Sequence, residues 1–249
     1  MIVSVRSAAT VIDIATDGMS APPHEPHQPH PIKGVWRLLS EDRSILEIRA
    51  LSPKGSTKSL PPIIRHFRKS DYIDFASLKI DFESTALALN TEGYNLYTPI
   101  NPIRSDFRGP GGARDIDIER RTWILIDIDR KGDTSCPASE EELGAARALA
   151  RSIRDYLASL RWPLPLLMAS GNGLHCYYPL ANLENSEAIS VQIKRTLSGL
   201  ATKFDTDVVG VDRVVYNAAR ITKIPGTIAR KGIESEGRPY RMAMMLDDL

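Results

Sequence analysis

An apolar strand followed by a well-marked amphipathic helix constrains the fold of this chain most. Residues 123–129 read Trp-Ile-Leu-Ile-Asp-Ile-Asp, which is the pattern of a buried β-strand. Ser139 and Glu142 then form a capping box, and apolar side chains follow at spacings of three and four as far as Leu160. A second amphipathic helix is predicted over about 186–204. Strands separated by helices in this way predict an α/β or α+β domain built on one main sheet.

Shorter strands are predicted on both sides of this block. They cover residues 44–51, 95–100, 166–169, 174–178, 208–212 and 240–246. Residues 71–90 are partly helical in pattern, and 104–114 form a loop because they contain Gly-Pro-Gly-Gly. The sequence contains no internal repeat.

Charge and cysteine content limit the class of protein. Lys and Arg total 32 and Asp and Glu total 31, so the chain lacks the basic excess of a general nucleic-acid binder, and a polyanion must be bound by local clusters. Two cysteines are too few for a disulfide framework or a four-cysteine zinc site, and we expect no structural zinc. No apolar run reaches the ~18 residues of a membrane span. We therefore expect a cytoplasmic protein without a membrane partner.

The N-terminal part has a different composition from the rest. Residues 22–31 contain five prolines and three of the five histidines, which favours an extended linker. A His-rich tract can also bind metal, but the alternating prolines leave no second shell for such a site. We predict a flexible leader over residues 1–33 and a domain over residues 34–249.

Asp127 and Asp129 are the first candidate site residues. They are two apart at the end of a strand, so both side chains leave the same face about 7 Å apart, at a rise of ~3.3 Å per residue. Paired carboxylates suit Mg²⁺, which takes one or two of them together with substrate phosphates. The alternative is that the aspartates only end a buried strand at the solvent boundary.

A glycine-rich turn supplies the second candidate element. Ser170, Gly171, Asn172 and Gly173 precede Leu174 and His175. Glycines let backbone amides approach a phosphate, a serine hydroxyl can donate to it, and His175 should emerge on the same side of its strand as Tyr177. The alternative is an ordinary hairpin turn followed by a core histidine.

The third element runs from Asp212 to the Pro-Gly turn at Pro225 and Gly226. It contributes one carboxylate and two cations, Arg220 and Lys223. Alone it also fits an amphipathic edge strand with solvated charges. Together, the three elements contain the groups needed for metal-assisted phosphoryl transfer.

The order and content of these elements resemble the archaeo-eukaryotic primase superfamily, and specifically the primase-polymerases of phages, plasmids and other mobile elements. The resemblance covers roughly residues 94–232 and includes Tyr97-Thr98 and Asn101-Pro102. It implies an α+β (α/β) catalytic core with a central mixed sheet flanked by helices and an RRM-like half carrying the metal site. It also divides the domain into an N-terminal part, 34–93, and a motif-bearing core, 94–232.

The resemblance implies template-directed nucleotidyl transfer on single-stranded DNA, either primer synthesis or polymerisation. Asp127, Asp129 and Asp212 would hold two Mg²⁺ or Mn²⁺ ions. The incoming NTP or dNTP would be bound by seven residues: Ser170, Gly171, Asn172, Gly173, His175, Arg220 and Lys223. A helicase or a primase C-terminal domain is a candidate partner.

Two groups of cations are candidates for contact with the template. The first is Arg104, Arg108, Arg114, Arg120 and Arg121, and the second is Arg230, Lys231, Arg238 and Arg241. Tyr97 and Tyr177 are candidates for base stacking. Two other functions remain open, a catalytically silent replication-initiator or DNA-binding module and another DxD-containing nucleotidyl or glycosyl transferase.

Overall fold

The computed structural model describes residue 32 and residues 34–55, 59–132 and 135–249. The helices of these residues are α1 (Phe75–Thr91), α2 (Glu140–Ser159) and α3 (Glu187–Phe204). The strands are β1 (Ile45–Leu51), β2 (Ile63–Arg68), β3 (Asn95–Pro99), β4 (Arg120–Arg130), β5 (Leu166–Ala169), β6 (Gly173–Glu184), β7 (Val209–Val211), β8 (Ile221–Lys223), β9 (Ile228–Ala229), β10 (Arg241–Met242) and β11 (Met244–Leu246).

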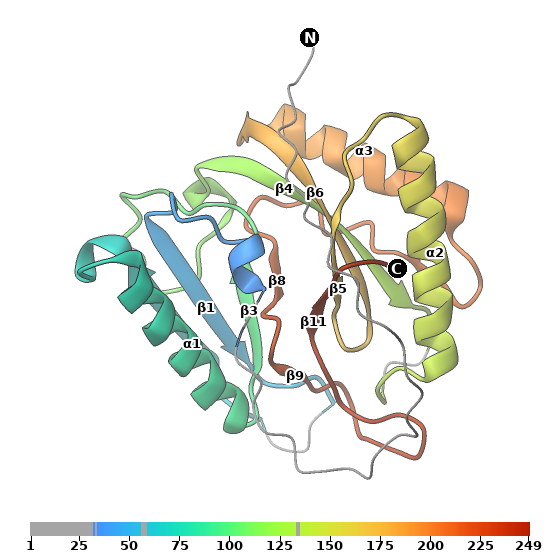
Figure 1. The fold of residues 1–249 in the computed structure, drawn as a ribbon, viewed down its shortest axis with the longest axis horizontal. Coiled ribbons are helices and arrows are strands. Elements are labelled where there is room, and N and C mark those ends of the chain that lie inside the picture. Colours follow the sequence, from blue (N-terminus) through green and yellow to red (C-terminus); the bar gives the residue numbers. More distant parts are fainter. Residues whose placement is uncertain (1–31, 33, 56–58, 133–134) are drawn as a thin grey trace, which may run out of the picture.

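The first large sheet has four strands in the order β2-β1-β3-β8, and each neighbouring pair is antiparallel. Helix α1 packs on β1 and β3 (Figure 1). Asp74 caps this helix, because its carboxylate accepts a hydrogen bond of 2.7 Å from the backbone N–H of Ser77. Leu78, Phe82 and Leu96 are among the buried side chains that form the core between helix and sheet.

The second large sheet has five strands in the order β11-β5-β6-β4-β7, also antiparallel throughout. Helices α2 and α3 cover it (Figure 1). The predicted capping box of α2 is confirmed: Ser139 Oγ accepts from the N–H of Glu142, and the Glu142 carboxylate accepts from the N–H of Ser139. Ile126, Ile153 and Leu197 belong to the core beneath the two helices.

The chain crosses from one large sheet to the other after β7. It leaves β7 of the five-stranded sheet and returns through β8 to the four-stranded sheet, where Thr222 lies opposite Thr98 of β3. The predicted α+β class is confirmed, whereas the expectation of a single central mixed sheet is wrong. Two antiparallel sheets form because each helical layer buries its own sheet, and a strand's partner cannot be read from its local pattern.

Three smaller expectations also change. The predicted strand 240–246 is divided at Ala243, because β10 pairs with β9 whereas β11 pairs with β5. The strand predicted to end at Tyr178 continues to Glu184. Leu160 lies just beyond α2 and is 53% exposed, so the apolar stripe of this helix ends at Leu157.

The predicted leader, residues 1–33 with the Pro/His-rich stretch, lies outside the described residues except for Ile32, which is buried. Among the helices of the described residues, none combines the length and the apolar character that crossing a membrane requires.

Candidate active site

A pocket of about 350 Å³ collects most of the predicted site residues. Its lining includes groups from both large sheets. We call Asp127, Asp129 and His175, which come from β4 and β6, the acidic wall. We call the cations that line it the basic wall: Lys54, Arg220, Lys223, Arg230 and Lys231.

The acidic wall is built by two long neighbouring strands. In the register of β4 and β6, Asp127 lies opposite His175 and Asp129 lies opposite Gly173. Burial disfavours the charge of Asp127, but the attraction of the neighbouring His175 outweighs this effect and holds the pKa of Asp127 below its usual value. Burial and the neighbouring charge of Asp127 raise the pKa of Asp129 to about 6. The two carboxylates are therefore electrostatically distinct.

His175 is buried but lies among polar groups. Its Nε2 is 3.3 Å from Oδ1 of Asp127, and its Nδ1 is 3.0 Å from both the Tyr177 hydroxyl and Oγ1 of Thr222. The predicted placement of His175 on the same side as Tyr177 is confirmed. The ring joins the carboxylate pair to β8 of the other sheet, which an ordinary core histidine would not do.

The loop before His175 has two faces. Ser170 and Asn172 line the pocket with the acidic wall, whereas Gly171 and Gly173 line a different cavity. Gly171 has φ +92°, and a Cβ there would lie 2.5 Å from the Cβ of Ala229. The turn thus requires glycine for both conformation and space. The loop residues predicted to bind nucleotide therefore alternate between two cavities.

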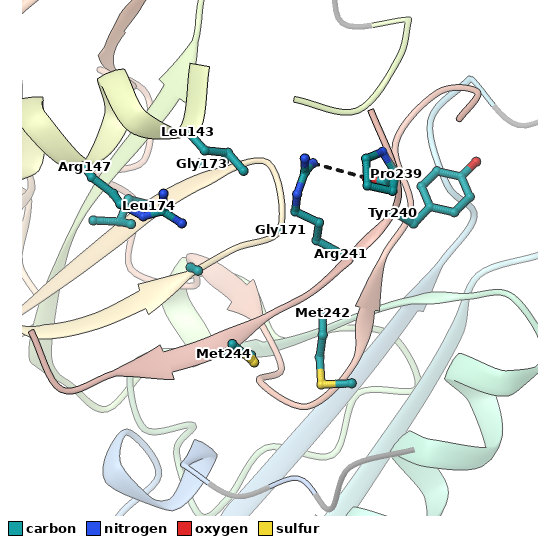
Figure 2. A pocket seen from close by; sticks show the side chains of 11 residues that line it. Leu143, Arg147, Gly171, Gly173, Leu174, Pro239, Tyr240, Arg241, Met242 and Met244 are labelled. Carbon is teal, nitrogen blue, oxygen red and sulfur yellow. Dashed lines mark hydrogen bonds between the residues drawn. The ribbon is translucent and has the colours of Figure 1, made fainter. Parts of the chain in front are cut away.

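The second cavity, also of about 350 Å³, lies behind this loop (Figure 2). Its lining is mainly apolar and includes Leu143, Leu174, Met242 and Met244. Two arginines, Arg147 and Arg241, also line it, as Figure 2 shows. The loop therefore separates a charged cavity from an apolar one.

The basic wall contains four cations that the sequence had indicated and one that it had not. Arg220 and Lys223 were expected to bind nucleotide, Arg230 and Lys231 were expected to bind template, and Lys54 was not predicted. Burial and the charges of Arg230 and Lys231 hold the pKa of Lys223 well below its usual value. Its Nζ lies 4.5 Å from the ring centre of Tyr97, a distance typical of a cation–π contact.

Asp212 is close to the acidic wall but outside the pocket lining. Its backbone N–H donates to the carbonyl of Asp127 over 2.8 Å, and its Oδ1 accepts from the N–H of Val214 over 2.8 Å. In the part of the chain that the structure describes, no three His, Cys, Asp or Glu side chains are grouped to hold a metal ion. The side chain of Asp212 is thus engaged in a turn, and its role as a third ligand stays a prediction.

The acidic wall nevertheless fits a divalent cation. Among the described residues, Oδ1 of Asp127 is buried and accepts no well-aligned hydrogen bond, and the ring of His175 approaches it without the required geometry. Carboxylate oxygens are the ligands that Mg²⁺ and Mn²⁺ prefer, and Mg²⁺ commonly uses one or two of them with substrate phosphates and water. Asp127 and Asp129 can supply the protein's share of such a site.

The other seven arginines predicted to contact template do not line the pocket. Arg104 pairs with Asp106, Arg114 with Asp117, and Arg120 with Asp42. Arg121 is buried and donates to Ser190 and to the carbonyl of Tyr216. Arg238 and Arg241 pair with Glu142 and Glu140, and Arg108 donates to backbone carbonyls.

Sequence reasoning missed Lys54, Asn95 and Thr222, all of which line the pocket. Thr222 lies between the two predicted cations Arg220 and Lys223, so alternation along a strand would have drawn attention to it. Lys54 and Asn95 reach the pocket only because β1 and β3 are neighbours in the sheet. No pattern around either residue indicates this.

Comparison with protein-family models found no match, and comparison with curated proteins found none either. Solved structures do match. The AEP domain of the cyanophage S-2L primase-polymerase is 17% identical with a TM-score of 0.50, over 88% of this chain and 89% of that one. Primase RepB′ is 13% identical, with a TM-score of 0.47, over 87% of this chain and 56% of that chain.

The polymerase domain of Mycobacterium tuberculosis ligase D, in complex with DNA, is 15% identical with a TM-score of 0.46, over 81% of this chain and 78% of that one. At these identities the likeness concerns the fold. The match to the phage domain extends over almost the whole of both chains. The chain has the archaeo-eukaryotic primase, or primase-polymerase, fold.

Proposed function

We propose that this pocket catalyses template-directed nucleotidyl transfer on single-stranded DNA, as primer synthesis, DNA polymerisation or both. The observation that carries the proposal is that two carboxylates and five cations line the same pocket. A nucleoside triphosphate with its metal ion needs both kinds of group, because the ion requires oxygen ligands and the phosphates require positive charge.

The acidic wall would hold the metal ions through Asp127 and Asp129, with further ligands from the triphosphate. Mg²⁺ or Mn²⁺ bound there would lower the pKa of the attacking hydroxyl and neutralise charge on the leaving pyrophosphate. Asp212 is the proposed third ligand, and it would have to release the N–H of Val214 to take part.

The basic wall and the loop would bind the triphosphate. Arg220, just before β8, and Lys223, at its end, would contribute charge, and Ser170 and His175 would contribute hydrogen bonds from the five-stranded sheet and the loop that precedes β6. Lys54, Arg230 and Lys231 extend the positive surface, either toward the triphosphate or toward the DNA backbone. The whole segment 34–249 would act as one catalytic unit, with a helicase or primase C-terminal domain as a proposed partner.

The test is nucleotide incorporation by the full chain on single-stranded DNA with Mn²⁺ or Mg²⁺, with and without a primer and with dNTPs and NTPs supplied separately. Asp127→Asn and Asp129→Asn should each reduce incorporation by about 10³-fold, because each removes a metal ligand worth several kcal/mol. Asp207→Asn is the matched control, since Asp207 is exposed and lies outside the pocket lining.

Two outcomes would contradict the proposal. The first is no incorporation by the native chain with any nucleotide class, which would favour a silent DNA-binding module. The second is full activity in the Asp127→Asn, Asp129→Asn double variant. If the double variant is inactive but Asp212→Asn retains full activity, a DxD transferase of another kind becomes the better interpretation.

A further inference from the structure

The ring of His175 is held from behind by two buried hydroxyl groups. Tyr177 is on the same strand, β6, and Thr222 is on β8 of the other sheet. Each hydroxyl oxygen lies 3.0 Å from Nδ1 of His175, and the two hydroxyls also hydrogen-bond to each other. Tyr177 is fully buried and Thr222 is 1% exposed, so water does not compete for these bonds.

We infer that Thr222 and Tyr177 are positioning residues, which fix the imidazole of His175 so that its Nε2 points to Asp127 and the pocket. This inference rests on the proposed function, because it assigns a purpose to the direction of Nε2. The imidazole of a histidine on a strand can turn over about the Cβ–Cγ bond, which exchanges each nitrogen with a ring carbon and would take Nε2 away from Asp127. Two partners on Nδ1 remove that freedom.

Hydroxyl groups suit this task because each can donate or accept a hydrogen bond. When Nδ1 carries a proton, Thr222 can accept from it and donate to Tyr177, whose hydroxyl donates to Sδ of Met168 over 3.8 Å. When Nδ1 carries none, one hydroxyl turns its hydrogen to it. The ring therefore keeps one orientation in either state, which a carboxylate or a carbonyl partner could not ensure.

The hydroxyl of Thr222 also connects the two walls of the pocket by a hydrogen bond. It is the middle residue of β8, between Ile221 and Lys223, and its hydroxyl reaches a ring carried by the five-stranded sheet. The bond between Thr222 and His175 thus fixes the distance from the basic wall to the acidic wall at the point where the triphosphate would bind.

A purely structural role for the hydroxyls predicts a different result. In that case their removal lowers stability, as for any buried hydrogen bond, and leaves nucleotide affinity alone. Thr227 offers the comparison: its buried hydroxyl donates to the carbonyl of Ile224 over 2.7 Å, and it does not line the pocket. Thr222→Val and Thr227→Val each remove one buried hydroxyl without changing side-chain shape.

The experiment measures the affinity of the full chain for dATP with Mn²⁺ by calorimetry, and the KM and kcat of incorporation. Thr222→Val should weaken dATP binding and raise KM about fivefold to tenfold, the loss expected for one hydrogen bond. Thr222→Ser, which keeps the hydroxyl, should stay within about twofold of the native chain. Thr227→Val should lower the melting temperature without changing either value.

A double-mutant cycle with His175→Ala decides the matter. If Thr222 acts through His175, Thr222→Val should have no further effect on dATP affinity once the ring is gone. The inference would be overturned if Thr222→Val reduced dATP affinity by the same factor with and without the imidazole of His175. It would also be overturned if the Thr222→Val variant had native dATP affinity. If Thr222→Val does not fold, the same cycle is run with Tyr177→Phe.

Failure of the proposed function can be recognised separately. If the native chain incorporates no nucleotide, the dATP affinities and the imidazole ¹H–¹³C signals of His175 still test the inference. A large change in those signals in Thr222→Val, but not in Thr227→Val, supports ring positioning. Unchanged signals in both variants would refute it.

Discussion

The two walls of the pocket are built in different ways. The acidic wall lies on β4 and β6, which pair over most of their length, so the hydrogen-bonded ladder fixes Asp127, Asp129 and His175. The basic wall comes from the three-residue strand β8 and from segments that follow β1 and the two-residue strand β9. Short strands provide few ladder bonds, so other contacts must position these cations.

Buried asparagines provide those contacts. Asn95 donates from Nδ2 to the carbonyl of Arg230 over 2.7 Å and accepts from its N–H over 2.8 Å. Asn90 binds the N–H and the carbonyl of Ile228 in the same manner. The acidic wall is therefore fixed by backbone pairing and carries an electrostatic cost, whereas the basic wall depends on individual side chains. Single substitutions should consequently affect the two walls differently.

The largest expected effect on stability concerns Asp129. Its pKa of about 6 lies above the 3.8 of a free aspartate, so ionisation of Asp129 destabilises the folded chain by about 3 kcal/mol. This destabilisation is absent below about pH 4, where Asp129 is protonated in the folded and the unfolded chain. It develops as the pH rises from about 4 to about 6 and is constant above that. Asp129→Asn avoids this ionisation, and its advantage in free energy of unfolding over the native chain should grow across that range.

Urea unfolding at pH 4, 5, 6 and 7 with EDTA measures this advantage, with Asp207→Asn as the control. Added Mg²⁺ or Mn²⁺ should reduce it, because a bound cation stabilises the native carboxylate pair. A difference between Asp129→Asn and the native chain that is independent of pH would contradict the electrostatic account of the acidic wall.

The next effect concerns the fixation of the basic wall. Asn95→Ala leaves the buried N–H and carbonyl of Arg230 without these partners and should cost about 2 kcal/mol in free energy of unfolding. The segment that carries Arg230 and Lys231 should also loosen, and dATP affinity should fall. Urea unfolding and calorimetry with dATP measure the two effects.

Asn185→Ala is the matched control for this change. Asn185 also makes two hydrogen bonds to the backbone, in this case by donating to the carbonyls of Asp115 and Ile118, and it lies outside the pocket lining. It should lower stability and leave dATP affinity unchanged. If Asn95→Ala behaves in the same way, the asparagine contact does not position the basic wall for nucleotide.

The contrast between the walls also explains what could be predicted from the sequence. The DxD strand, the capped helix α2 and the turn before His175 follow from local patterns of apolar spacing, capping and glycine, and the structure has all three. The basic wall depends on contacts such as that between Asn95 and Arg230, which are 135 residues apart. Nothing local in either segment indicates the pairing, and for the same reason the two separate sheets could not be foreseen.

The smallest expected effect is on the salt dependence of single-stranded DNA binding, and it compares the arginines of residues 104–114 with the basic wall. The guanidinium of Arg104 donates to both carboxylate oxygens of Asp106, over 3.1 Å from Nε and 2.9 Å from Nη2. The charge of Arg104 is therefore already largely neutralised. Among the described residues, no carboxylate lies within salt-bridge distance of Lys231, and the charge of Lys231 limits the rise in the pKa of Asp129. Each phosphate neutralised on single-stranded DNA contributes about 0.7 to the dependence of log affinity on log salt.

Lys231→Gln should therefore reduce the salt dependence of single-strand binding by about 0.7, provided that Lys231 contacts a DNA phosphate. Arg104→Gln should change the salt dependence by less than half as much, because the guanidinium of Arg104 is already paired with Asp106. Loss of this pair should itself have little effect, since both side chains are exposed. Binding to a fluorescent oligonucleotide from 50 to 300 mM salt, about the range in which such slopes are linear, measures both. A larger change for Arg104→Gln than for Lys231→Gln would place the template on the loop rather than on the basic wall.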